Sequence, residues 1–255
     1  MSIIHWIRRP AGIVMIPAIV LGLLLVSQFQ PQTNNMGIGS EALIIFGLLG
    51  PALALSAAWE AFRVSDVLKS HNSVKVILKG FISRVYLLLP IGIFGYLAGV
   101  LVLWKSGIPD SLGWTILLSV FHTLAWVSLG FSLGLVLPPI WGLTSATIIP
   151  FLLCAIPAGL EPGPIRHLFG VPVACCGLGS QLNHEMVYTS LLGLGAVCVA
   201  SIVLLLIPVY RKLSITAFVV PAALVALGIQ TASGIGVTAA SPREASELHC
   251  AQNVC

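Results

Sequence analysis

The charged side chains that could do chemistry gather in one short part of an otherwise apolar chain. Seven of the twenty charged residues fall between residues 57 and 84, in the segment AAWEAFRVSDVLKSHNSVKVILKGFISR. They are two acids and five bases: Glu60, Arg63, Asp66, Lys69, Lys75, Lys79 and Arg84. Charges of both signs in one segment suit ion pairs with a second protein or with lipid headgroups.

The spacing of apolar residues in this segment predicts two helices. Four apolar residues lie near helical spacing in its first half and four more in its second half. They are Phe62, Val64, Val67 and Leu68, then Val74, Ile77, Leu78 and Phe81. Lys75 and Lys79 share the opposite face of the second helix. We expect this amphipathic helix to lie along the inner membrane surface and to run into a membrane span.

A polar turn separates the two predicted helices. Its residues are Lys69, Ser70, His71, Asn72 and Ser73, and a serine or asparagine here could cap the second helix. Two interpretations stay open. The lysines could simply extend from the helix to lipid headgroups, or the turn could be a docking element that receives force from a soluble protein.

Motifs for catalysis are missing from the chain. No Gly-Lys-Ser or Gly-Lys-Thr of an ATP-binding loop occurs. His184 and Glu185 begin a zinc-protease motif, but position 188 is Tyr where the motif needs His. Gly-x-Ser-x-Gly occurs once, at Gly130 to Gly134, but inside an apolar predicted span and not in the strand-to-helix turn that the hydrolase motif requires. We therefore expect no enzyme activity, catalytic residue, metal site or bound cofactor in this chain.

His122 is the ionisable residue predicted to lie deep in a membrane span. Ion pumps and proton-coupled carriers usually keep several ionisable residues at depth. A haem held by two histidines needs a second histidine at depth. The sequence therefore argues against an ion-coupled transporter and against such a haem site. We expect the His122 side chain to hydrogen-bond to a neighbouring helix.

The composition identifies an integral membrane protein. Of the 255 residues 58% are hydrophobic and 8% are charged, and the mean hydropathy is +1.05. A soluble domain carries about 25% charged residues, so this chain could not cover a water-facing surface. The net charge is +4, and the basic residues flank apolar runs. Basic residues in this position set the orientation of a protein in the membrane. We therefore expect no nucleic-acid partner.

Seven apolar runs are long enough to be membrane spans, which need about 20 residues. They cover residues 11–28, 41–58, 81–104, 113–136, 142–160, 187–209 and 213–232. Pro150 and Pro157 interrupt the fifth run. Aromatic residues that suit the membrane interface mark several ends, namely Trp6, Trp59, Trp104, Trp114, Trp141, Tyr188 and Tyr210.

The distribution of basic residues predicts the orientation. With the N-terminus in the cytoplasm, nine lie inside: Arg8, Arg9, Arg63, Lys69, Lys75, Lys79, Arg84, Arg211 and Lys212. Three lie outside: Lys105, Arg166 and Arg243. The positive-inside rule favours this arrangement, and seven spans then place the C-terminus outside.

Two other features concern packing. Gly95 and Gly99, and Gly130 and Gly134, are glycine pairs four residues apart that allow close helix contact, within the chain or across a dimer. The apolar but Gly- and Pro-rich segment 160–186 is too interrupted for a span. We expect a pair of short helices that dip into the outer leaflet and return, since non-helical backbone at membrane depth needs cover; a partly apolar surface loop is the alternative.

In this order of elements, residues 1–210 resemble the permease subunit of ABC-2-type exporters, in particular lantibiotic-immunity and drug-export permeases. The resemblance is carried by the cytoplasmic N-terminus, the charged element WEAFRVSDVLKSHNSVKVILKGFISR between spans two and three, and the outer segment between spans five and six. It implies an all-α membrane protein with a six-span core in a bacterial cell membrane.

The resemblance also implies partners and a site. Two permease subunits, identical or different, would each bind a separate ATP-binding subunit that holds ATP and Mg. The element at residues 60–80 would be the coupling helix, with Lys69 to Ser73 seated on that subunit and Glu60, Arg63 and Asp66 holding it there. The substrate would be an amphiphilic peptide, drug or lipid, and membrane lipid would surround the subunit.

Residues 211–255 depart from this family pattern. They hold a seventh span and a polar tail, SPREASELHCAQNVC. In an oxidising exterior, Cys250 and Cys255 could form a disulfide with each other or with another segment. We expect the tail to begin an extracytoplasmic module, or the chain to be part of a longer protein. The alternative function is a membrane anchor or sensor subunit that does not transport and presents such a module.

Overall fold

The computed structural model describes residues 10–28, 38–71, 73–104, 112–159, 168–169, 180–182, 184–207, 219–232 and 240–242. Nearly all of these residues are helical. The long helices are α2 (Pro10–Ser27), α4 (Phe46–His71), α5 (Val74–Leu103), α6 (Leu112–Val136), α7 (Pro139–Gly159), α9 (His184–Leu206) and α10 (Val219–Ala232). The short α3 (Ile38–Ala42) and the 3₁₀ turn η1 (Leu43–Ile45) lead directly into α4.

Each predicted span overlaps one of these helices, which confirms the predicted helical architecture. Four helical stretches are long and apolar enough to cross a bilayer: Leu43–Leu68, Val74–Leu103, Leu112–Val136 and Glu185–Leu206. Three shorter ones, Ile13–Ser27, Pro139–Cys154 and Val219–Thr231, are equally apolar. These helices are compatible with a multi-pass protein, and the count of six spans plus one stays a prediction.

Local sequence explains where several helices begin and end. Pro10 and Pro139 open α2 and α7, at the position where proline's missing N–H costs nothing. Helix α6 ends at Val136, just before Leu137 and Pro138, since a residue that precedes proline disfavours helical backbone. Helix α7 continues to Gly159 through both prolines that interrupt its apolar run, as helices within membranes tolerate.

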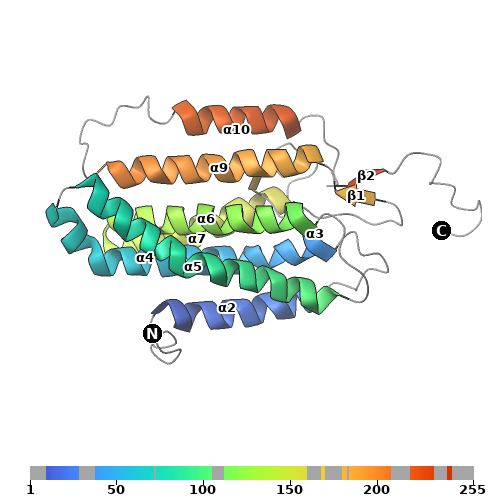
Figure 1. The fold of residues 1–255 in the computed structure, drawn as a ribbon, viewed down its shortest axis with the longest axis horizontal. Coiled ribbons are helices and arrows are strands. Elements are labelled where there is room, and N and C mark those ends of the chain that lie inside the picture. Colours follow the sequence, from blue (N-terminus) through green and yellow to red (C-terminus); the bar gives the residue numbers. More distant parts are fainter. Residues whose placement is uncertain are drawn as a thin grey trace, which may run out of the picture.

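The helices form a layered bundle with α2 at one edge and α10 at the opposite edge (Figure 1). The most extensive packing joins α4 to α6, and α7 covers both. Helix α9 packs on α6, and α10 packs mainly on α9. Helix α5 runs obliquely across α4 and also contacts α6 (Figure 1).

A seam of small residues holds α4 against α6. A Cβ atom added to Gly130 would collide with the backbone of Ala54, and one added to Gly134 would collide with the backbone of Ala58. One turn earlier, a Cβ on Gly50 would lie 2.8 Å from Nε1 of Trp126. Both helices advance by four residues from one contact to the next, so they run parallel. Helices two spans apart have this relation in a chain that crosses a membrane repeatedly.

The second glycine pair also packs within the chain. A Cβ on Gly95 would lie 2.7 Å from Leu49, and one on Gly99 would lie 3.5 Å from Ala42. Both predicted pairs therefore serve helix contacts inside one subunit.

A two-stranded pairing joins the segment before α9 to the segment after α10. Strand β1 (Ser180–Leu182) pairs antiparallel with β2 (Ala240–Pro242), with Gln181 opposite Ser241. At the same end, the hydroxyls of Thr189 and Thr231 lie 3.0 Å apart and join α9 to α10. Helices α9 and α10 are therefore antiparallel neighbours, with the start of α9 beside the end of α10.

Part of the segment predicted to re-enter the membrane is described. Leu168 is buried, and its backbone lies against Gly193 of α9. Gly193 is nine residues into α9, about 14 Å along the helix axis. This depth agrees with a segment that dips into the bundle. Residues 180–182, however, form strand β1 where the sequence predicted helix, and residues 184–186 begin α9. The other residues of the segment lie outside the described ranges.

Candidate functional site

Helices α4 and α5 form a hairpin at the charged segment (Figure 1). The sequence predicted a separate short helix before the turn, but α4 continues unbroken from the bundle through Trp59 to His71. The second predicted helix is likewise the first part of α5, which runs on to Leu103. The turn is thus joined to the core of the bundle by two continuous helices.

The start of α5 confirms the predicted capping position but not the predicted cap. Ser73 has extended backbone, with φ −125° and ψ 123°, and its hydroxyl makes no capping hydrogen bond. Instead its carbonyl accepts hydrogen bonds from the N–H groups of Val76 and Ile77, both at 3.1 Å. The change of backbone conformation at Ser73 is therefore what separates the two helices.

The amphipathic face predicted for the start of α5 is present. Ile77 is fully buried, and the Phe81 ring lies 5.7 Å from the Phe131 ring of α6. A Cβ on Gly80 would lie 3.1 Å from Leu68, which shows how closely α5 packs on α4. Lys75 and Lys79 are exposed on the other side. The hairpin is therefore packed onto the bundle by its apolar face.

Glu60 lies inside the hairpin, where it connects the two helices. It is 5% exposed. Its carboxylate lies 3.6 Å from Arg63 on the same helix and 4.0 Å from Arg84 on α5. Arg84 also donates hydrogen bonds to the carbonyl of Gly80 and the hydroxyl of Ser83. The sequence analysis did not include Arg84 in the site. Its positive charge could have indicated a pair with Glu60, because the two residues lie on the two predicted helices that flank the turn.

The exposed face of α4 differs from the predicted one. Leu68 is buried and Val64 is half-buried, as expected, but Phe62 and Val67 are 41% and 59% exposed. These two residues lie on an exposed stripe of α4 at i, i+3, i+4, i+7 and i+8. The stripe consists of Trp59, Phe62, Arg63, Asp66 and Val67. We refer to these five residues as the α4 stripe.

The other predicted site residues are placed as follows. Lys69, Ser70 and His71 belong to the last turn of α4, next to the break in the backbone. Asn72, Cys250 and Cys255 lie outside the described residues. Among the cysteines that the structure describes, Cys154 is buried and Cys198 half-buried, and both are free thiols. No group of His, Cys, Asp and Glu in the described ranges could hold a metal ion.

His122 does not make the hydrogen bond that its position in a span predicted. It is fully buried, and its ring stacks on Phe46 of α4 with ring centroids 5.0 Å apart. Within the described part of the chain, neither ring nitrogen has a hydrogen-bond partner, and the same is true of the nearby indole N–H of Trp126. His122 thus contributes a flat aromatic surface to the contact between α4 and α6.

Comparison of the chain with protein-family models, with curated proteins and with solved structures finds no match.

Proposed function

We propose that this chain is a transmembrane subunit of an ATP-driven exporter of the ABC-2 type. In this proposal the hairpin of α4 and α5 is the coupling element on which a separate ATP-binding subunit docks. The observation that carries the proposal is the α4 stripe beside a polar helical turn. Aromatic residues and arginine are the residues that dominate binding at protein interfaces, and the stripe presents Trp59, Phe62 and Arg63 together.

In this proposal the hairpin transmits a displacement from the turn to the helices of the bundle. Helix α4 extends from the turn to the small-residue seam with α6 without a break. Because Glu60 and Arg84 join α4 to α5, a load on the turn moves both helices together. Arg63 and Asp66 are exposed and can face a partner, whereas the buried Glu60 positions the hairpin. Nucleotide and Mg would be bound by the ATP-binding subunit, and the cargo would be an amphiphilic peptide, drug or lipid.

Co-purification tests this proposal. The tagged chain is expressed with its genomic neighbours, extracted in mild detergent, and tested for a bound ATPase by mass spectrometry and ATP hydrolysis. We expect an ATP-binding protein to co-purify and Phe62→Ala to weaken its binding at least tenfold, which corresponds to about 1.4 kcal/mol. Charge reversal at the turn, with Lys69→Glu and His71→Asp, is expected to act in the same direction.

Phe94→Ala is the matched control. Phe94 is 66% exposed on α5, some 32 residues along the chain from Phe62 and away from the turn. Its removal should leave the ATPase bound. Absence of any ATPase from the wild-type preparation would contradict the proposal, as would equal effects of Phe62→Ala and Phe94→Ala.

A second candidate is a membrane anchor or sensor subunit that does not transport. It is favoured by the pairing of β1 with β2, which ties the segment after α10 to the bundle. In this case the wild-type chain would co-purify with a membrane or extracytoplasmic protein and no ATPase.

A further inference from the structure

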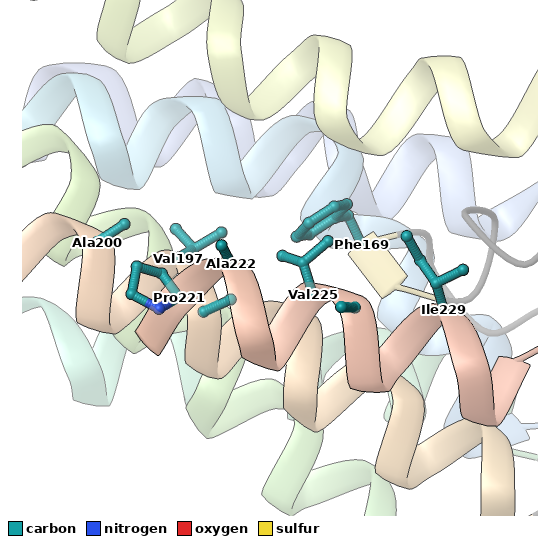
Figure 2. A pocket seen from close by; sticks show the side chains of 9 residues that line it. Phe169, Val197, Ala200, Pro221, Ala222, Val225 and Ile229 are labelled. Carbon is teal, nitrogen blue, oxygen red and sulfur yellow. The ribbon is translucent and has the colours of Figure 1, made fainter. Parts of the chain in front are cut away.

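Three buried nitrogen atoms in the contact between α4 and α6 have no hydrogen-bond partner among the described residues. They are the two ring nitrogens of His122 and the indole nitrogen of Trp126, and both side chains are fully buried. The open apolar face between α9 and α10 differs in kind, because none of the nine side chains that line it carries a hydrogen-bonding group (Figure 2). A buried polar group without a partner destabilises a fold, so three at one place indicate a small polar molecule that pairs with them.

The three nitrogens lie within about one turn of α6. The ring centroids of His122 and Trp126 are 6.2 Å apart. Phe46 stacks on the face of the His122 ring, which leaves the edge of that ring, with both nitrogens, for hydrogen bonds. Two hydrogen bonds of about 2.9 Å each span a separation of this order, so one small molecule can bridge the two rings.

The backbone of α4 keeps the edge of the indole open. A Cβ on Gly50 would lie 2.8 Å from Nε1 and 2.9 Å from Cδ1 of Trp126, so any side chain here would cover the indole N–H. The next residue, Pro51, lies inside α4 and lacks the N–H that would bond to the carbonyl of Gly47. This carbonyl can therefore accept a hydrogen bond from outside the helix.

The chemistry of these groups identifies the ligand. An indole N–H only donates, whereas a neutral imidazole donates through one nitrogen and accepts through the other. The ligand must therefore both accept and donate. Helix α6 contains no Asp, Glu, Lys or Arg, which argues against an ion, since a buried charge needs a partner. Water meets these requirements, and a buried water typically makes about three hydrogen bonds.

We propose that His122 and Trp126 bind a buried water molecule in the contact between α4 and α6. The indole N–H donates to the water oxygen, and the water donates to the unprotonated ring nitrogen of His122. The second O–H of the water is directed to the carbonyl of Gly47. The water thus joins the two helices next to Pro51, where α4 lacks one of its internal hydrogen bonds.

Solid-state NMR with proton detection tests this proposal. The full chain is labelled with ¹⁵N-tryptophan and reconstituted into bilayers of perdeuterated lipid, and the transfer of magnetisation from water to each indole N–H is measured. Trp126→Phe identifies the signal of Trp126. We expect transfer to this buried N–H, at a rate at least threefold higher than in His122→Phe, which keeps a ring beside Phe46 but removes both nitrogens.

Two glycine variants on α4 show whether the transfer reports this site. Gly50→Ala places a methyl group over the indole N–H, and we expect the rate to fall at least threefold. Gly47→Ala is the matched control, because a Cβ there would meet no atom within 4 Å, and the rate should not change. Should Gly50→Ala fail to fold, His122→Phe carries the test.

The proposal would be overturned if the wild type showed no transfer from water to the Trp126 N–H. Equal rates in the wild type and in His122→Phe would also overturn it, as would equal effects of Gly50→Ala and Gly47→Ala. The assay contains no ATPase, so its outcome is independent of the coupling role proposed for the hairpin.

Discussion

At the scale of single residues, the ion pairs around Glu60 distinguish a structural charge from exposed ones. Glu60 is buried between two arginines, one half-exposed on its own helix and one on α5. A buried carboxylate that loses a cationic partner keeps its full desolvation cost, whereas an exposed arginine can be solvated by water. Arg84 and Arg63 should therefore contribute very differently to stability.

Arg84→Gln is expected to lower the free energy of unfolding by about 1–3 kcal/mol, because it leaves Glu60 buried without its partner on α5. Unfolding by SDS titration in mixed micelles measures this change. In the double variant Glu60→Gln and Arg84→Gln, much of the loss should be recovered, since no buried charge remains.

Arg63→Gln is the control for that experiment. The Arg63 side chain is 54% exposed, and exposed pairs contribute at most about 1 kcal/mol. A loss for Arg63→Gln as large as that for Arg84→Gln would contradict the assignment of Arg84 as the residue that joins the two helices.

At the scale of elements, the contact between α4 and α6 depends on the absence of side chains. At Gly130 and Gly134 an added methyl group would meet backbone atoms, which cannot rotate away as a side chain can. By contrast, a Cβ on Gly195 of α9 would meet no atom within 4 Å. The same substitution should therefore have opposite effects at the two places.

Gly130→Ala is expected to destabilise the protein by about 1–3 kcal/mol through overpacking at the seam. Gly195→Ala should be neutral or stabilising by up to about 1 kcal/mol, because alanine favours helix over glycine. SDS titration or thermal unfolding in detergent compares the two. If both variants behaved alike, the close approach of α4 to α6 would be contradicted.

Most of the helices could be predicted from the sequence. The apolar runs indicated every long helix, because the bilayer demands a length and a composition that show directly in the residues. The turn near Ser73 and the buried face of early α5 were also predicted. The partner of each glycine pair could not be predicted, since spacing indicates close contact without naming the other helix.

Parts of the site were likewise beyond the sequence pattern. Phe62 and Val67 have helical spacing with Leu68, yet they are exposed, because the face that is buried depends on where α5 and α6 pack. The role of Arg84 depends on α5 folding back over α4, a tertiary contact that local periodicity does not contain. His122 was expected to hydrogen-bond to a neighbouring helix, but it stacks on Phe46 instead.

At the scale of the whole molecule, the relative directions of the helices agree with repeated membrane crossing. Helix α4 is parallel to α6, and α9 is antiparallel to α10, as shown by the seam and by the pairing of Thr189 with Thr231. Strands β1 and β2 flank the α9–α10 pair and must share one side of the membrane. The positive-inside rule predicts that this side is the exterior.

Cysteine labelling in intact cells tests the orientation. In a background where the six native cysteines are serine, we expect an impermeant maleimide to label Gln181→Cys and Ser241→Cys. Ser73→Cys, in the hairpin turn, should react after permeabilisation and not before. The reverse pattern would invert the orientation and would place the hairpin on the side where no ATP-binding subunit could reach it.

The seam between α4 and α6 has a mechanical consequence. Wherever side chains separate two helices, rotamer changes can absorb a small movement, but at Gly130 and Gly134 one backbone lies directly on the other. This contact allows little relative movement of the two helices, because closely packed interiors are hardly compressible. A displacement of α4 at the hairpin is therefore expected to displace α6 with it. Bending is then left to the prolines within the helices, Pro51 in α4 and Pro90 in α5.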